Sequence, residues 1–268
     1  MTTENYTPLK YPVLFLHGFG FRDGKKNKYW GRIPDFFEKA GCKVYFGCQE
    51  GGATTEDNAL FLKGRTEEIL RETSAEKVNI IAHSKGGLEA RYLISSLGMA
   101  DKVASLTTIG TPHRGSKTMD KFPKWTFKIS AFFTHIGMRI IGDKHPQVYK
   151  VYVSFRASEM EKFNLENPDN DKVYYQSYAF VLNKGSSLWL PHKAIKRFEG
   201  DNDGLVSTYS AEWGDFKGVK RGNGKRGISH GDETDVKRKP FASEAEGGVS
   251  DILEIYEEIM QTLYNKGF

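Results

Sequence analysis

The segment Ala82-His83-Ser84-Lys85-Gly86 places a serine in a setting that suits covalent catalysis. An apolar run over residues 78–82 precedes it, and a stretch with helical spacing follows it. A G-x-S-x-G turn between a strand and a helix exposes the serine hydroxyl, because small flanking residues let the two elements approach closely. Ala82 replaces the first glycine of that pattern and adds one methyl group. The spacing predicts Ser84 as a nucleophile, against the alternative of a serine N-cap on an ordinary loop.

A serine nucleophile needs a histidine as base and a carboxylate that orients this histidine. In this kind of fold the chain order is serine, acid, histidine. Among the seven histidines, His230 alone follows a suitable acid loop and comes just before the C-terminal segment. The acid loop is "FEGDNDGLVS", in which Asp203 is the predicted acid and Asp201 the alternative, because surface turns often have this composition. We therefore expect Ser84, Asp203 and His230 to form a triad.

Acyl transfer also needs backbone N–H donors for the developing oxyanion. One donor follows the nucleophile, at Lys85, and only its backbone is needed. A second donor belongs in the loop after an earlier strand, and the apolar run that ends in "LHGFG" provides it at Phe19. The sequence predicts an oxyanion hole from Phe19 and Lys85, although a His-Gly pair after a strand is also a common simple turn.

The elements that must position these residues alternate between strand and helix signals, which predicts an α/β fold with a mostly parallel sheet flanked by helices. We expect strands at 12–18, 43–47, 78–82, 103–112, 173–182 and 194–200, and helices at 30–41, 54–73, 86–98 and 249–268. In the helix at 54–73 the expected inner face contains Leu60, Phe61, Ile69 and Leu70. Ser250 is the candidate N-cap of the last helix.

The region 115–171 interrupts this alternation, because it has no clear strand and its apolar residues recur at helical spacing. A long helical insertion after a core strand often covers a site, so we predict a helical cap or lid there, with plain core packing as the alternative. The whole chain, 1–268, is then one domain with this insertion.

Composition is that of a soluble globular chain: 268 residues, 38% hydrophobic, 27% charged and a formal net charge of +5. The basic segments within 215–240 have no aromatic or helical reader beside them, which favours a solvated loop or hairpin over nucleic-acid binding and leaves a weak attraction to anionic lipid. Cys42 and Cys48 would lie about 20 Å apart along a strand, so we expect free thiols.

No window is long enough to span a membrane, and no signal peptide is visible at the N-terminus. We therefore expect no stable membrane insertion. The location is left open between the cytoplasm and secretion with a signal absent from this sequence. No sequence feature predicts an oligomeric state.

These residues together resemble a known family, the bacterial triacylglycerol lipases of Pseudomonas, Burkholderia and Proteus type and their clostridial relatives, in the α/β-hydrolase superfamily. The matching pieces in chain order are "PVLFLHGFG", "YWGRIPDFFEKAGCKVYF", "KVNIIAHSKGGLEARYL", "IGTPHRGS", "NDGLVS" and "SHGDETD". The resemblance implies Ser84 as nucleophile, Asp203 as acid and His230 as base, with Phe19 and Lys85 as oxyanion donors. It also implies a mobile helical lid at 115–171 and an acyl ester or lipid substrate, met at a lipid–water interface.

The resemblance implies no cofactor for catalysis. Many members bind a structural calcium through the aspartate two residues after the histidine, here Asp232, and a second aspartate upstream of the acid loop. No aspartate occurs at 172–199, so this chain lacks the second ligand of the family pattern. The family's disulfide is not reproduced either.

The sequence therefore predicts a serine hydrolase that cleaves lipid esters through an acyl-enzyme. The alternatives are a carboxylesterase or thioesterase for short soluble acyl substrates and, in a different class, an inactive binding protein on a hydrolase fold.

Overall fold

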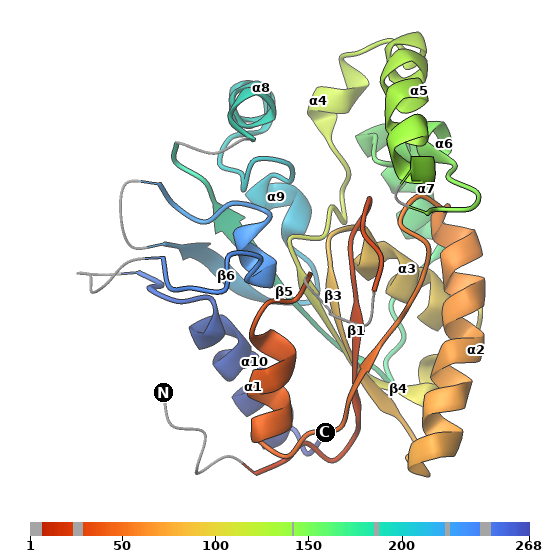
Figure 1. The fold of residues 1–268 in the computed structure, drawn as a ribbon, viewed down its shortest axis with the longest axis vertical. Coiled ribbons are helices and arrows are strands. Elements are labelled where there is room, and N and C mark those ends of the chain that lie inside the picture. Colours follow the sequence, from red (N-terminus) through yellow and green to blue (C-terminus); the bar gives the residue numbers. More distant parts are fainter. Residues whose placement is uncertain (1–6, 24–28, 141, 185–187, 223–225, 242–247) are drawn as a thin grey trace.

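A computed structural model of the chain describes residues 7–23, 29–140, 142–184, 188–222, 226–241 and 248–268. Within them a parallel six-stranded sheet has the order β2-β1-β3-β4-β5-β6. The strands are β1 Val13–Leu16, β2 Val44–Phe46, β3 Val78–His83, β4 Val103–Ile109, β5 Tyr174–Val181 and β6 Asp215–Arg221. The helices that follow these strands cover both faces of the sheet (Figure 1). This is the predicted α/β-hydrolase architecture.

Two hydrophobic cores form because side chains of a strand alternate between the faces of the sheet. On β1, Phe15 enters the core under α1 (Ile33–Lys39) and α10 (Leu253–Asn265). Its neighbour Leu16 points the other way, into the core under α2 (Thr55–Thr73) and α3 (Lys85–Ile94). Strand β1 is therefore buried on both faces, which explains its uninterrupted apolar sequence.

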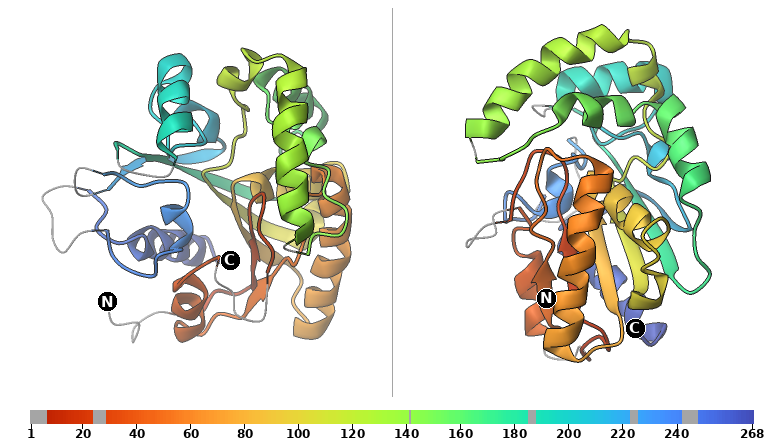
Figure 2. Two further views of the ribbon diagram at one scale, coloured as in Figure 1. Left: turned by 45° about the horizontal axis from the view of Figure 1, so that its top comes forward. Right: turned by 90° about the vertical axis from the view of Figure 1, so that its right-hand side faces the viewer.

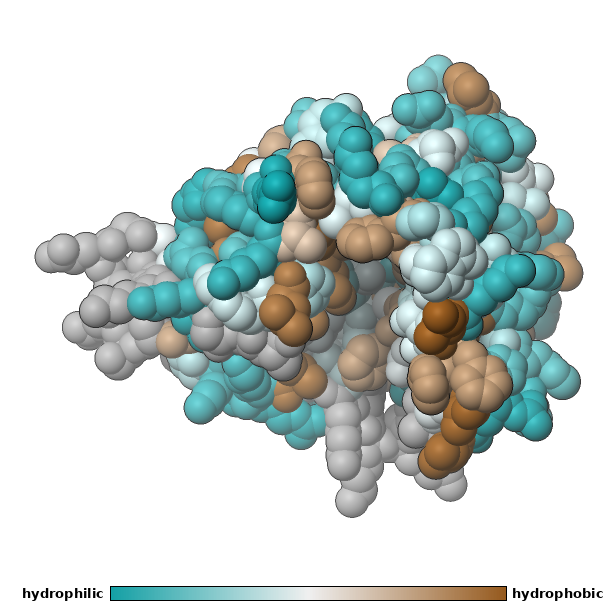
Figure 3. All heavy atoms as spheres, turned by 90° about the horizontal axis from the view of Figure 1, so that it is seen from above, coloured by the Kyte–Doolittle hydropathy of each residue, from teal (hydrophilic) through white to brown (hydrophobic). Residues whose placement is uncertain are grey.

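The region 115–171 is helical, as predicted, and lies above the carboxyl end of the sheet (Figures 1 and 2). It contains α4 Lys117–Asp120, α5 Lys124–Ile140, α6 Val148–Ser154 and α7 Ala157–Glu166. Helix α5 exposes a row of large apolar side chains: Trp125, Ile129, Phe132, Phe133, Ile136 and Ile140. Seen from above, hydrophobic residues gather in a row beside a central hollow (Figure 3). Plain core packing does not describe this face of α5.

The predicted strand at 194–200 is wrong, because this segment lies in helix α8 (Trp189–Glu199). His192 and Ile195, three residues apart, are its buried residues, as a helix with one inner face requires. Pro191 fits in the first turn, where backbone N–H groups have no helical partner. The last strand is instead β6, which contains part of the basic segment that was expected to be a loop. Residue 225 of that segment lies outside the described residues.

Helix α2 is where the sequence predicts it, but its inner face differs. Leu60 is 64% and Phe61 52% exposed, whereas Asn58, Ala59 and Leu62 are buried. Helix α2 packs against α3, and the amide of Asn58 donates to Glu89 on α3 at 2.7 Å. Polar and small residues therefore take positions that size and hydropathy alone assign to Leu60 and Phe61.

The expected cap of the last helix is also displaced, because α10 begins at Leu253 with Ile252 at the N-cap. Ser250 lies outside the helix, and its backbone N–H bonds Glu254 Oε1 at 3.1 Å. Two shorter elements, η1 (Ala100–Lys102) and α9 (Thr208–Ala211), complete the connections near β4 and β6. The cysteines are free, as predicted: Cys42 is buried and Cys48 is exposed. Among the described helices none is long and apolar enough to cross a membrane.

Candidate active site

The turn between β3 and α3 holds Ser84 in a backbone conformation that non-glycine residues rarely adopt, with φ at 54° and ψ at −127°. Such a conformation costs about 1–3 kcal/mol and persists only where its surroundings enforce it. The surroundings here are hydrogen bonds: Ser84 N donates to Ile109 O at 2.9 Å, and Thr111 Oγ1 donates to Ser84 O at 2.8 Å. Both partners follow from β4, so the neighbouring strand fixes the turn.

Close packing around this turn explains its small residues. A Cβ atom on Gly86 would lie 2.7 Å from the carbonyl oxygens of Leu16 and His17, at the end of β1. A Cβ on Gly18 would lie 2.9 Å from the Cβ of Ser84. Helix α3 and the loop after β1 therefore approach so closely that these two positions accept only glycine without a shift of the backbone.

His230 and Asp203 are joined by two hydrogen bonds. The ring Nδ1 of His230 lies 2.8 Å from Oδ2 of Asp203, and His230 N donates to Asp203 O at 2.9 Å. Oδ1 of Asp203 accepts from the backbone N–H groups of Leu205 and Val206 at 2.7 and 2.8 Å. Burial alone would raise the pKa of Asp203, but the charge of His230 and these bonds outweigh it and lower the pKa. Asp203 is therefore a buried carboxylate, while Asp201 is held at the surface by Lys196 and Arg221.

The acid loop does not follow a strand along the chain, contrary to the sequence interpretation, but it lies beside one. Leu182 N, just after β5, donates to Asn202 O at 2.8 Å. Oδ1 of Asn202 lies 2.8 Å from the ring of His192 on α8 and accepts from Gly204 N at 2.9 Å. Strand β5 thus provides the position and α8 the support of Asp203.

The two predicted oxyanion donors, Phe19 and Lys85, lie on the facing segments: the loop after β1 and the first residue of α3. The ring of Phe19 packs on Tyr152 and Phe155 of the helical region, with centroids 5.6 and 6.4 Å away. The side chain of Lys85 is buried and bonds Glu89, so it is directed away from the site.

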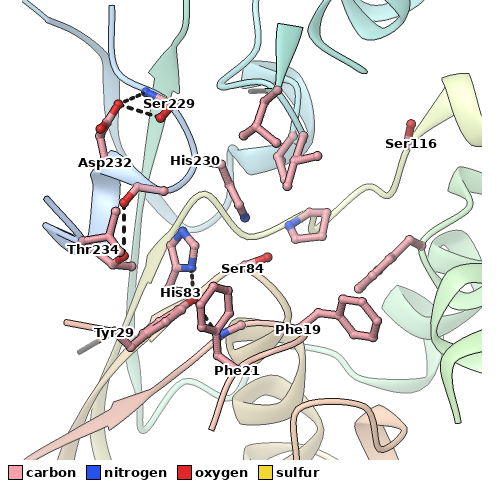
Figure 4. A pocket seen from close by; sticks show the side chains of 18 of the residues that line it. Phe19, Phe21, Tyr29, His83, Ser84, Ser116, Ser229, His230, Asp232 and Thr234 are labelled. Atoms are coloured by element: carbon pink, nitrogen blue, oxygen red, sulfur yellow. Dashed lines mark hydrogen bonds between the residues drawn. The ribbon is translucent and has the colours of Figure 1, made fainter. Parts of the chain in front are cut away.

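Ser84 and His230 line a common cavity of about 750 Å³ (Figure 4). The ring of His230 extends toward Ser84 in that view, and Phe19 lies on the other side of the serine. Apolar wall residues come from the helical region and the acid loop: Met119, Tyr152, Phe155, Leu188, Leu205 and Val206. The cavity can therefore receive an acyl chain next to the serine hydroxyl, and no ring of charges opposes it.

The sequence analysis did not assign three buried residues behind Ser84: Tyr29, His83 and Glu233. The hydroxyl of Tyr29 lies 2.5 Å from Nδ1 of His83, and Nε2 of His83 lies 3.1 Å from Oε2 of Glu233. Burial, followed by the charge of His230, lowers the pKa of His83 well below its ordinary value. Burial, followed by the charge of Asp203, raises the pKa of Glu233 well above its own. The one signal in the sequence was the spacing of Glu233, three residues after His230.

Asp232, the calcium ligand that the resemblance suggests, is already neutralised by cations. Its carboxylate lies 2.7 Å from Arg226 and 3.1 Å from Lys237, and it accepts from Ser229 N at 2.9 Å. A calcium site needs several oxygen ligands around the ion, whereas these neighbours are positive or donate hydrogen bonds. The residues present therefore do not fit calcium.

The comparisons with known proteins follow this geometry. Residues 12–181 match the family model described as palmitoyl protein thioesterase. A Saccharomyces cerevisiae protein named triacylglycerol lipase 2 is 31% identical, over 99% of this chain and 94% of that one. A Pseudomonas fragi triacylglycerol lipase is 29% identical over 76% of this chain and 83% of that protein. The match to the Burkholderia plantarii triacylglycerol lipase, at 36% identity, covers 45% of this chain and 34% of that one.

Solved structures agree on the fold. A Bacillus licheniformis lipase superposes with a TM-score of 0.67 over 98% of this chain and 96% of that one, at 21% identity. A metagenomic carboxyl esterase superposes with a TM-score of 0.70 over 96% of this chain and 77% of that one, at 14% identity.

Proposed function

Because this chain belongs to the triacylglycerol lipases of the α/β-hydrolase superfamily, we propose that it hydrolyses carboxylic esters of lipids through an acyl-enzyme on Ser84. The observation that carries the proposal is the Asp203–His230 pair, at 2.8 Å, in the same apolar cavity as the strained serine turn. The conclusion rests on this site geometry together with the family, since fold alone does not determine activity.

In the proposed reaction, Nε2 of His230 takes the proton of the Ser84 hydroxyl as its Oγ attacks the ester carbonyl. The N–H groups of Phe19 and Lys85 stabilise the oxyanion of the tetrahedral intermediate. The protonated His230 then gives its proton to the leaving alcohol, and the acyl group stays on Ser84. Water, activated by the same histidine, releases the fatty acid and restores the serine. Asp203 holds the imidazole tautomer and stabilises the imidazolium.

The helical region 115–171 acts in this proposal as a lid within the single domain of the chain. Its residues Met119, Tyr152 and Phe155 line the cavity, which gives the acyl chain an apolar wall. The exposed apolar row of α5 suits contact with a lipid–water interface. No cofactor takes part in these steps.

A second candidate activity, hydrolysis of long-chain acyl thioesters, is favoured by the match of residues 12–181 to the palmitoyl protein thioesterase model. The same triad would attack a thioester carbonyl, and the leaving group would be a thiol. The two candidates differ in the substrate and share every catalytic residue.

The test is hydrolysis of p-nitrophenyl esters from acetate to palmitate, with palmitoyl thioesters in parallel, by wild type and Ser84→Ala. Loss of the nucleophile should lower the rate by several orders of magnitude. A preference for long chains supports the lipase. A preference for butyrate without gain at an emulsion surface indicates an esterase for soluble substrates. No turnover by the wild type would favour the binding protein.

A further inference from the structure

A continuous chain of buried polar groups runs behind the proposed triad, from the loop of the oxyanion donor to the catalytic acid. Gly18 N, next to Phe19, donates to the hydroxyl of Tyr29 at 2.8 Å. This hydroxyl meets Nδ1 of His83 at 2.5 Å, and Nε2 of His83 meets Oε2 of Glu233 at 3.1 Å. The chain thus reaches a carboxyl group beside the proposed triad.

Glu233 in turn hydrogen-bonds the carboxyl group of Asp203. Gly110, on the loop after β4, leaves the space that the two carboxyl groups share. A Cβ there would lie 3.2 Å from Oδ2 of Asp203 and closer still to Oε2 of Glu233. Oε2 of Glu233 is also 3.7 Å from Nδ1 of His230.

A single arrangement of protons satisfies every contact in this chain. The Tyr29 hydroxyl accepts from Gly18 and donates to Nδ1 of His83, which leaves the ring proton of His83 on Nε2. That N–H donates to Oε2 of Glu233. The remaining contact joins two carboxyl groups, so one of them must carry a proton and donate it. Burial and the adjacent charge of Asp203 raise the pKa of Glu233, which identifies Glu233 as the donor.

We propose that Glu233 is a positioning residue that donates a hydrogen bond to Asp203 and accepts one from His83, linking the oxyanion loop to the carboxylate that orients His230. The role of these two ends rests on the proposed function. Through this link Asp203 keeps its negative charge aimed at His230, and Tyr29 holds the loop of Phe19 against the serine turn.

The charged surroundings of Glu233 define the pH dependence of this link. The titratable groups that face it come from several elements: Tyr29, His83, Asp203, His230, Asp232 and Tyr256. None of these is a permanent cation, so ionised Glu233 would add a second negative charge beside Asp203. It would then lose its donor proton to Asp203, and the geometry of the acid would be disturbed. We expect activity to decline at alkaline pH as Glu233 ionises.

The experiment compares wild type, Glu233→Gln, Glu233→Leu and the exposed control Glu72→Gln on α2 across a pH series, with kcat and KM for a p-nitrophenyl ester. Gln keeps one donor and one acceptor without a titratable proton, so Glu233→Gln should retain kcat within about threefold at pH 7 and lose the alkaline decline. Leu leaves buried polar partners unsatisfied, so kcat should fall by about tenfold to a hundredfold with little change in KM. The control should match wild type.

Infrared spectroscopy reads the proton on Glu233 without turnover, as a protonated carboxyl band at pH 7 that Glu233→Gln lacks. If this band is absent, or if Glu233→Gln loses as much kcat as Glu233→Leu, the inference is overturned. Wild-type kcat in Glu233→Leu would overturn it as well. A wild type without turnover but with the band would refute the proposed function and leave the carboxyl pair established.

Discussion

Substitution of Gly86 by alanine tests whether the serine turn presses against the end of β1. The added Cβ would lie 2.7 Å from the carbonyl oxygens of Leu16 and His17, which is 0.7 Å short of the 3.4 Å at which ordinary contact begins. Both carbonyls belong to backbone next to a strand paired on each side by β2 and β3, so neither can move alone.

The expected loss of stability follows from two opposing effects. Overpacking against a rigid backbone costs about 1–3 kcal/mol, while alanine gains about 1 kcal/mol over glycine in a helix. A net loss of about 1–2 kcal/mol corresponds to a fall in Tm of about 2–8 °C for a chain of this size. The backbone shift would also move Phe19 relative to Ser84. A misplacement near 1 Å can cost about a hundredfold in rate, so we expect kcat/KM to fall by about tenfold or more.

The assay is thermal unfolding together with kcat/KM for Gly86→Ala, with Gly64→Ala as the matched control. Gly64 lies exposed in α2, and a Cβ there meets no atom within 4 Å. The control should gain about 0.5–1 kcal/mol and keep its activity. Wild-type Tm and activity in Gly86→Ala would refute the close approach of α3 to β1.

Three further predictions concern stability. Native Glu233 keeps its proton above the pH at which the unfolded chain releases it, about 4.3, so stability decreases as pH rises from there toward the raised folded pKa. The Tm of Glu233→Gln relative to wild type should therefore increase from about pH 5 to about pH 8, and a constant difference would contradict the raised pKa. Arg91 is buried, lies 3.8 Å from the centroid of Trp213 and donates to Asn164 on α7 at 2.7 Å, so Arg91→Ala should lower the free energy of unfolding in urea by about 3 kcal/mol or more. A loss below about 1 kcal/mol would show that Arg91 does not hold α7 to the body. The cations around Asp232 predict that neither EDTA nor added calcium changes Tm, whereas a rise with calcium would show that these ion pairs open to bind it.

The serine turn could be predicted from sequence because its determinants are local. A strand, a tight turn with small residues and a helix follow one another at 78–94, and the structure has β3 and α3 there. The chain order then selected Asp203 and His230, which the structure brings within hydrogen-bonding distance. Residues 27 positions apart meet because the loop at 202–207 lies against the end of β5.

The errors arose where tertiary packing overrides local pattern. The segment at 194–200 has enough apolar residues for a short strand, but only the burial of His192 and Ile195 on one side shows that it is helical. On α2 the largest apolar side chains were assigned inward, whereas close packing on α3 buries Asn58 and Ala59.

The link through Glu233 could not be predicted from sequence for a related reason. Tyr29, His83 and Glu233 lie far apart in the sequence, and each alone is an ordinary polar residue. Their chemistry depends on complete burial in one place, which raises the pKa of Glu233 and lowers that of His83. Only the fold brings them together.

The most direct test of the proposed mechanism is to label the protein with a fluorophosphonate and map the adduct by mass spectrometry. Such a probe reacts with a serine that a neighbouring base activates. The account predicts one adduct, on Ser84, that is lost in Ser84→Ala and strongly slowed in His230→Ala. An unlabelled Ser84 in a folded protein that hydrolyses esters would contradict it.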